Sequence, residues 1–150
     1  MSRKTVIALS ALILSPLLIY FLWPSDENRI RKLFREGAKA IEEEKIEDVL
    51  SKLSFTYKDE HGFSYLMIRE GLERVFLQMS GIKIEYEIEN LTIKDNTAYA
   101  VLELRVIATY GQDTGYAVGD AAKPVRIKFS LEKERTSWLV SKTEGMPFRF

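Results

Sequence analysis

The stretch IKIEYEIENLTIKDNTAYAVLELRVIA, residues 82–108, decides the fold class of this chain. Apolar and charged side chains alternate over residues 82–89, which is the pattern of a strand with one face in the core and one face in solvent. Lys-Asp-Asn at 94–96 predicts a turn, and every second residue from 98 to 108 is apolar. The stretch therefore predicts two long antiparallel strands joined by a tight turn.

The position of the turn also predicts the register of this hairpin. A turn centred on Asp95 places Ile84 opposite Val106 on the apolar face and Glu85 opposite Arg105 on the polar face. Both are favourable cross-strand pairs, so the turn and the side-chain pattern agree.

Two further strands follow this hairpin. Apolar positions alternate over residues 125–131, and a last strand carries Trp138 and Val140. A four-residue loop at 133–136 would pair Leu131 with Trp138. The connecting stretch 111–120 (GQDTGYAVGD) is predicted to be a flexible loop, since its two aspartates lack the spacing of a calcium-binding loop.

Helical periodicity precedes the sheet. A helix that starts at Asp26, with Ser25 as its N-cap, carries apolar residues on one face, a short helix covers 46–53, and a third follows Ser64. A short strand at 55–57 lies between the second and third of these helices. The chain is therefore predicted to be one α+β domain over residues 26–150, joined by a linker at 24–25 to the segment before it.

Residues 5–23 (TVIALSALILSPLLIYFLW) contain no charge and follow a short basic N-terminus at residues 1–4. As a helix this run spans roughly 28 Å, close to the hydrocarbon core of about 30 Å. We expect an uncleaved transmembrane signal-anchor, because bulky residues rather than small ones follow the apolar run. The alternative, a cleaved signal peptide, would release a secreted product that starts near Ser25.

The basic N-terminus favours a cytoplasmic start and an exported domain, although basic residues also lie at 29–35 on the other side of the run. The sequence therefore predicts a single-pass protein of the bacterial inner (cytoplasmic) membrane with an extracytoplasmic domain.

Composition excludes several classes of function. Lys+Arg and Asp+Glu both number 22, so no net charge favours nucleic acid, and none is expected as a partner. There is no cysteine and only one histidine, His61, so thiolate chemistry is excluded and neither a metal site nor a cofactor is expected.

The order of two helices, a short strand, a third helix and long antiparallel strands resembles the nuclear transport factor 2-like fold, also called the cystatin-like cone or SnoaL-like fold. The stretch Tyr57-Lys58-Asp59-Glu60-His61-Gly62 before the third helix carries the same resemblance, which covers about residues 26–144. It implies three helices packed on a curved antiparallel sheet, with a conical pocket between them.

Some members of this superfamily are enzymes, among them ketosteroid isomerases and dehydratases, and others bind ligands or act as scaffolds. The isomerase pattern needs a tyrosine on the first helix of the domain and acidic residues inside the pocket, and this sequence has neither. The dehydratase pattern uses paired histidines, and only His61 is present. No catalytic set is therefore implied for this chain by the resemblance.

The weak catalytic candidates are Asp59 and His61, where a carboxylate could orient an imidazole base, and the neighbouring Tyr57. The alternative interpretation is a polar turn in which Asp59 binds backbone amides. The ligand pocket of the cone is predicted to be lined by inward-facing side chains from the third helix and the sheet, namely Phe76, Tyr86, Leu104, Phe129 and Trp138.

Tyr99, Val101 and Ile107 are apolar although they lie on the outer face of their strand. An outer face in solvent should be polar, so we expect a homodimer or another protein partner to cover them. The predicted function is a non-catalytic, membrane-tethered module that binds a partner protein, itself or a small apolar ligand. The alternative is a small hydrolase, isomerase or lyase with its chemistry near Asp59 and His61.

Overall fold

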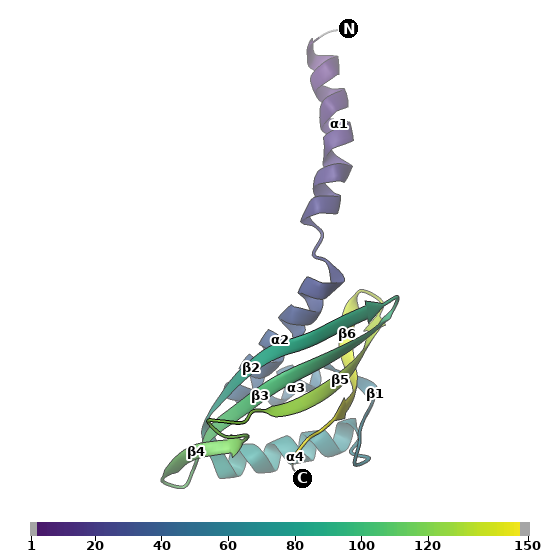
Figure 1. The fold of residues 1–150 in the computed structure, drawn as a ribbon. Coiled ribbons are helices and arrows are strands. Elements are labelled where there is room, and N and C mark those ends of the chain that lie inside the picture. The colour runs from purple at the N-terminus through teal and green to yellow at the C-terminus, as the bar shows by residue number, and fades with distance from the viewer. Residues whose placement is uncertain (1–2, 148–150) are drawn as a thin grey trace.

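The structure, a computed structural model, describes residues 3–147. For residues 3–9 and 21 it describes the backbone but not the side chains. It places helices α2–α4 on one face of a twisted sheet, with α1 extending away from this domain (Figure 1). The elements are α1 (Arg3–Leu22), α2 (Asp26–Glu42), α3 (Ile46–Leu50), β1 (Leu53–Asp59), α4 (Tyr65–Gln78), β2 (Met79–Lys94), β3 (Thr97–Tyr110), β4 (Asp113–Val118), β5 (Val125–Glu134) and β6 (Ser137–Glu144).

Helix α1 stands apart from the sheet and from the other helices (Figure 1). Its side chains from residue 10 to residue 20 are all exposed. Among the residues that the structure describes, no helix is long and apolar enough to meet the requirement for a bilayer span. The side chains of residues 5–9 and 21, which belong to the predicted anchor, lie outside the described residues.

Helix α2 begins where the sequence predicts, because its first turn is capped. The Ser25 hydroxyl accepts a hydrogen bond from the Asn28 backbone amide at 3.2 Å, which satisfies one of the free amides of the first turn. The Asp26 carboxylate accepts hydrogen bonds from Lys133 Nζ at 2.9 Å and from Trp138 Nε1 at 3.1 Å. These contacts fix the start of α2 against the hairpin of β5 and β6.

The sheet has the strand order β1-β6-β5-β3-β2, with β4 pairing to β3 alone. Strand β1 runs parallel to β6, so the sheet is mixed and the prediction of an antiparallel sheet is wrong at this edge. Alternation of apolar residues determines which face of a strand is buried, but it carries no information on strand direction. The parallel neighbour of β1 lies more than 80 residues away in the sequence, at 137–144.

The predicted register of the first hairpin is confirmed. Ile84 lies opposite Val106 and Glu85 opposite Arg105, as the turn at Asp95 requires. The second hairpin differs from its prediction, since Leu131 lies opposite Val140 rather than Trp138. This shift by two residues preserves the faces, because side chains alternate with a period of two.

Strand β4 lies within the stretch predicted to be a flexible loop, and that prediction is wrong. Strand β5 pairs with β3 only over 97–104, and β4 pairs with the remaining part of β3 over 106–110. The loop therefore becomes a strand because β3 is longer than β5 and leaves backbone groups at 106–110 that need partners.

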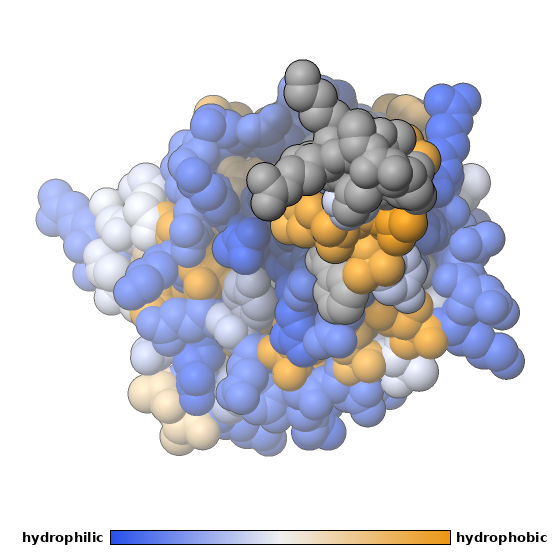
Figure 2. Space-filling view, turned by 90° about the horizontal axis from the view of Figure 1, so that it is seen from above, coloured by the Kyte–Doolittle hydropathy of each residue, from blue (hydrophilic) through white to orange (hydrophobic). Residues whose placement is uncertain are grey.

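The core lies between the sheet and helices α2–α4. Ile30, Leu50 and Leu131 are almost completely buried in it, and Ala100 on β3 has no exposed surface. Because small alanines line β3 at 98 and 100, α2 can approach the sheet closely. Seen from above, with α1 pointing toward the viewer, the exposed surface is mostly hydrophilic, and hydrophobic residues gather next to the grey atoms (Figure 2).

Candidate functional site

The predicted catalytic residues Asp59 and His61 lie in the turn between β1 and α4. Asp59 Oδ1 accepts hydrogen bonds from the backbone amides of His61, at 2.8 Å, and Phe63, at 2.7 Å. The Asp59 carboxylate thus organises the backbone of the turn, as in the polar-turn interpretation. Gly62 adopts a φ of 85° in this turn, a conformation in which any other residue would be strained.

The imidazole of His61 is next to Glu60 rather than bonded to Asp59. His61 Nε2 lies 3.6 Å from Glu60 Oε1, and the same oxygen accepts hydrogen bonds from the amides of Gly145 and Met146 at 2.7 and 3.1 Å. Glu60 therefore holds the chain that leaves β6. Sequence reasoning missed this contact, since the two segments are 85 residues apart and no local pattern indicates it.

Tyr57 is buried beneath the same turn. Its hydroxyl forms a hydrogen bond with the Thr143 hydroxyl on β6. Burial raises the pKa of the Tyr57 phenol to about 12, although the Thr143 hydrogen bond opposes this shift. The phenol therefore stays protonated at neutral pH and can act chemically only as a hydrogen-bond donor or acceptor.

The residues predicted to line an inner pocket pack against the helices. Phe129 meets Phe34 of α2 edge to face, with ring centroids 5.1 Å apart, and only 4% of Trp138 is exposed. Phe76 and Tyr86 are partly buried against the same core, and Leu104 is half-buried on the inner face. Burial raises the pKa of the Tyr86 phenol, and Arg35 and Arg31 partly offset that rise.

The outer face of the sheet carries the predicted interface residues in two separate places. Tyr99 and Val101 are neighbours on the outer face in the first half of β3, with Tyr99 39% exposed and Val101 half-buried. Ile107 lies farther along the strand, beyond Glu103 and Arg105, and pairs with the exposed Tyr116 of β4. We call the pair Tyr99 and Val101 the central seam.

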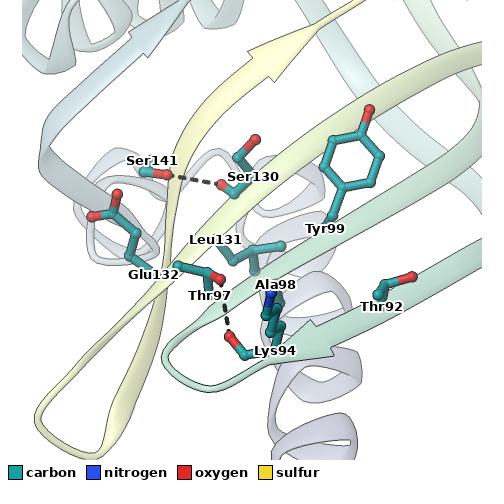
Figure 3. A pocket seen from close by; sticks show the side chains of 9 residues that line it. All are labelled: Thr92, Lys94, Thr97, Ala98, Tyr99, Ser130, Leu131, Glu132 and Ser141. Atoms are coloured by element: carbon teal, nitrogen blue, oxygen red, sulfur yellow. Dashed lines mark hydrogen bonds between the residues drawn. The ribbon is translucent and has the colours of Figure 1, made fainter.

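A shallow hollow of about 290 Å³ lies beside the central seam (Figure 3). The side chain of Tyr99 stands at its edge in Figure 3. Lys94 and Glu132 bring opposite charges to its lining, and the other polar groups are hydroxyls, contributed by Thr92, Thr97, Ser130 and Ser141. Tyr86, Phe129 and the other predicted pocket residues do not line this hollow. Its lining comes from β2, β3, β5 and β6, so the hollow could have been anticipated only from the register of four strands together.

A second hollow, of about 270 Å³, lies between α2 and α3. Its lining includes Glu36 and Lys52, whose side chains form an ion pair at 2.7 Å. The Lys52 hydrogen bond holds the pKa of the Glu36 carboxyl below its usual value. The two charges are thus paired with each other, which leaves little charge in this hollow to bind a ligand. Among the described residues, no group of three or more acidic or histidine side chains could hold a metal ion.

Solved structures share this architecture. A conserved protein from Planctomyces limnophilus superposes with a TM-score of 0.69 and 13% identity, covering 79% of this chain and 93% of that one. A putative scytalone dehydratase from Novosphingobium aromaticivorans gives 0.69 and 11%, covering 79% and 81%. A ketosteroid isomerase-like protein from Erwinia carotovora atroseptica gives 0.62 and 15%, covering 80% and 95%. The chain has the nuclear transport factor 2-like fold.

At these identities the likeness concerns the fold alone, because the nuclear transport factor 2-like fold hosts unrelated activities. No family model matches the sequence, and no curated protein matches it either. The resemblance predicted from element order is therefore confirmed at the level of fold, and any function must be argued from the side chains of this chain.

Proposed function

We propose that this chain is a non-catalytic, membrane-tethered nuclear transport factor 2-like domain that binds a protein through the outer face of its sheet. The observation that carries the proposal is the central seam, where the side chains of Tyr99 and Val101 lie between polar neighbours on β2 and β5, namely Thr92, Asn90, Ser130 and Lys128. Apolar side chains on the solvent side of an antiparallel sheet stabilise an interface when a partner removes them from water.

The membrane part of the proposal is supported by the uncharged run at 5–23 and by the exposure of apolar side chains around α1. Leu12, Ile13 and Leu14 are all more than half exposed, and as consecutive residues they point in directions about 100° apart around the helix. A helix that is apolar on all sides is stable only when buried, and the uncharged run at 5–23 has about the length of a bilayer core. The proposed location is the bacterial inner membrane, with the domain outside the cytoplasm.

A binding role fits the turn at 59–63 better than the catalytic alternative does. The catalytic alternative requires Asp59 to orient the His61 imidazole, but Asp59 Oδ1 accepts the backbone amides of His61 and Phe63 instead. The imidazole lies beside Glu60, with Nε2 3.6 Å from Oε1. On the inner face of the sheet, Phe129 and Trp138 already pack against α2. The side chains predicted to line a pocket for a small apolar ligand are therefore occupied, which favours a protein as the partner.

The experiment is a comparison of Val101→Glu with Leu77→Glu in the full chain, cross-linked in membranes and then solubilised in detergent for analysis. Leu77 lies on α4 and is 86% exposed, so the same charge there tests surface change without touching the outer face. We expect Val101→Glu to remain folded by circular dichroism but to lose cross-links to its partner in membranes, and Leu77→Glu to keep them. Equal cross-linking of both variants and wild type would overturn the proposed function.

A further inference from the structure

We infer that the free edge of strand β2 binds an extended segment of another protein, one with lysine or arginine at every second position. This site is separate from the central seam, so the inference goes beyond the proposed function. It is carried by the direction in which the backbone groups of β2 point and by the charges along the strand.

Strand β2 lies at the edge of the sheet and pairs only with β3 (Figure 1). The backbone amide of Ile84 in this strand donates to Glu42 Oε1, at the end of α2, at 2.8 Å. This amide therefore points away from β3. In an antiparallel pair the backbone groups of successive residues point in opposite directions, so Tyr86 and Ile88 share the direction of Ile84.

Hydrogen bonds at the other side of the sheet determine the direction for the far end of β2. The Val140 amide donates to the Lys52 carbonyl at 2.8 Å, so the backbone of Val140 points away from β5. The backbone of its partner Leu131 therefore points toward β3, where it pairs with Ala98. Ala98 in turn points away from β2, so the backbone groups of its partner Ile93 face the free edge.

Leu91, two residues before Ile93, has the same direction. The residues that present amides and carbonyls along the free edge are thus Tyr86, Ile88, Leu91 and Ile93. Within residues 3–147 no hydrogen bond reaches these outward amides. Glu42 closes the edge at Ile84, so the open part extends over residues 86–93, about 25 Å as a strand. Unpaired backbone groups of this kind are a template on which an extended peptide adds a strand.

The side chains of the same residues lie on the inner face of the sheet and are only partly buried. Tyr86, Ile88, Leu91 and Ile93 pack against the core and leave apolar surface beside the edge. A β-bulge between Ile88 and Asn90 bends the strand, and such bends limit indiscriminate edge pairing. The added strand therefore needs apolar side chains on its inner face.

The outer face of this edge is acidic, because Glu85, Glu87 and Glu89 lie on that side of β2. Glu85 and Glu89 form ion pairs with basic neighbours. Glu87 has none among the described residues, and its cross-strand neighbour Glu103 is acidic as well. Opposite charges on neighbouring strands attract, so a lysine or arginine beside Glu87 stabilises the added strand. Alternation then places basic residues on its outer face and apolar ones on its inner face.

The first test uses a synthetic octapeptide of alternating lysine and valine, added to the full chain in detergent micelles. Amide hydrogen exchange, followed by NMR, should slow about tenfold or more at Tyr86, Ile88, Leu91 and Ile93 when the peptide is saturating. The amide of Glu87 points toward β3 and should exchange at an unchanged rate. The control is the same peptide with every backbone nitrogen methylated, which keeps the charges and side chains but cannot donate to a strand. Slowing by both peptides, or by neither, would overturn the inference.

The second test reverses one charge on the edge. Glu87→Lys should weaken binding of the lysine–valine peptide about twofold to fivefold, because an exposed ion pair contributes only modestly. It should strengthen binding of a glutamate–valine peptide by a similar factor. Glu73→Lys, at an exposed position of α4, is the control and should change neither affinity. Equal effects of the two variants would contradict the assignment of a basic segment to this edge.

The edge of β2 and the central seam can fail separately. If the peptide slows no edge amide while Val101→Glu still loses its cross-links, the edge site is refuted and the proposed function stands. If the peptide slows the edge amides while Val101→Glu keeps its cross-links, the edge site stands and the proposed function fails.

Discussion

Replacement of Asp59 distinguishes a structural carboxylate from a catalytic one. Asp59→Ala removes the acceptor of two backbone hydrogen bonds, at 2.8 and 2.7 Å, from a residue that is 8% exposed. Each such bond contributes about 1 kcal/mol, and the burial of the unpaired amides adds to this, so the loss in unfolding free energy should be about 2–3 kcal/mol. For about 120 folded residues this lowers the Tm by about 8–12 °C.

Asp59→Asn is the matched control because its amide oxygen can accept the same two hydrogen bonds. It should cost less than about 1 kcal/mol, seen by thermal unfolding as a shift of less than about 4 °C. The assay is calorimetry of both variants beside wild type at pH 7. If Asp59→Asn is as unstable as Asp59→Ala, the charge rather than the acceptor geometry matters, and the assignment of Asp59 to the turn is refuted.

Two further predictions concern the anchor and the first turn of α2. Leu14→Lys places a charge at the centre of the apolar run and should make insertion less favourable by about 3 kcal/mol, measured as release of the full chain from washed membranes; unchanged retention would argue against a bilayer span. Hydrogen bonds from Lys133 and Trp138 lower the pKa of the Asp26 carboxyl in the folded protein. The stability that the Asp26 carboxylate contributes is therefore fully present above the unfolded pKa, near 3.8, and is lost as the pH falls through the lower folded pKa. The stability difference between wild type and Asp26→Asn should therefore shrink in acid unfolding scans below about pH 4, and a constant difference would contradict this.

The sequence predicts the parts of the fold that depend on local pattern. The Ser25 cap, the helix from Asp26 and the Ile84–Val106 register were all predictable, because each follows from spacing within one element or across one short turn. The predicted register of β5 and β6 was wrong because Arg135 adopts a φ of 57° in a tight turn. Arginine is rarely found in this conformation, so its presence in the sequence does not predict such a turn. The actual turn is therefore shorter than the predicted loop.

Features that depend on distant partners were not predictable. Strand β4 has five exposed residues out of six, so it lacks the alternation that marks a half-buried strand, and only its pairing with β3 orders it. The parallel pairing of β1 with β6 and the hydrogen bond from the Gly145 amide to Glu60 each join segments that are far apart in the sequence. At the candidate interface the sequence predicted Tyr99 and Val101, but it grouped them with Ile107, which the intervening Glu103 and Arg105 separate from them.

The connection between α1 and α2 consists of three residues, Trp23 to Ser25, and can span at most about 10 Å. If α1 lies in a bilayer, this short connection keeps every copy within one thin layer, where encounters occur by lateral diffusion. Tethered molecules reach local concentrations in the millimolar range, at which a contact of only modest intrinsic affinity is mostly occupied. A face as small as the central seam is then sufficient, and its strength in dilute solution would understate its occupancy beside the lipid.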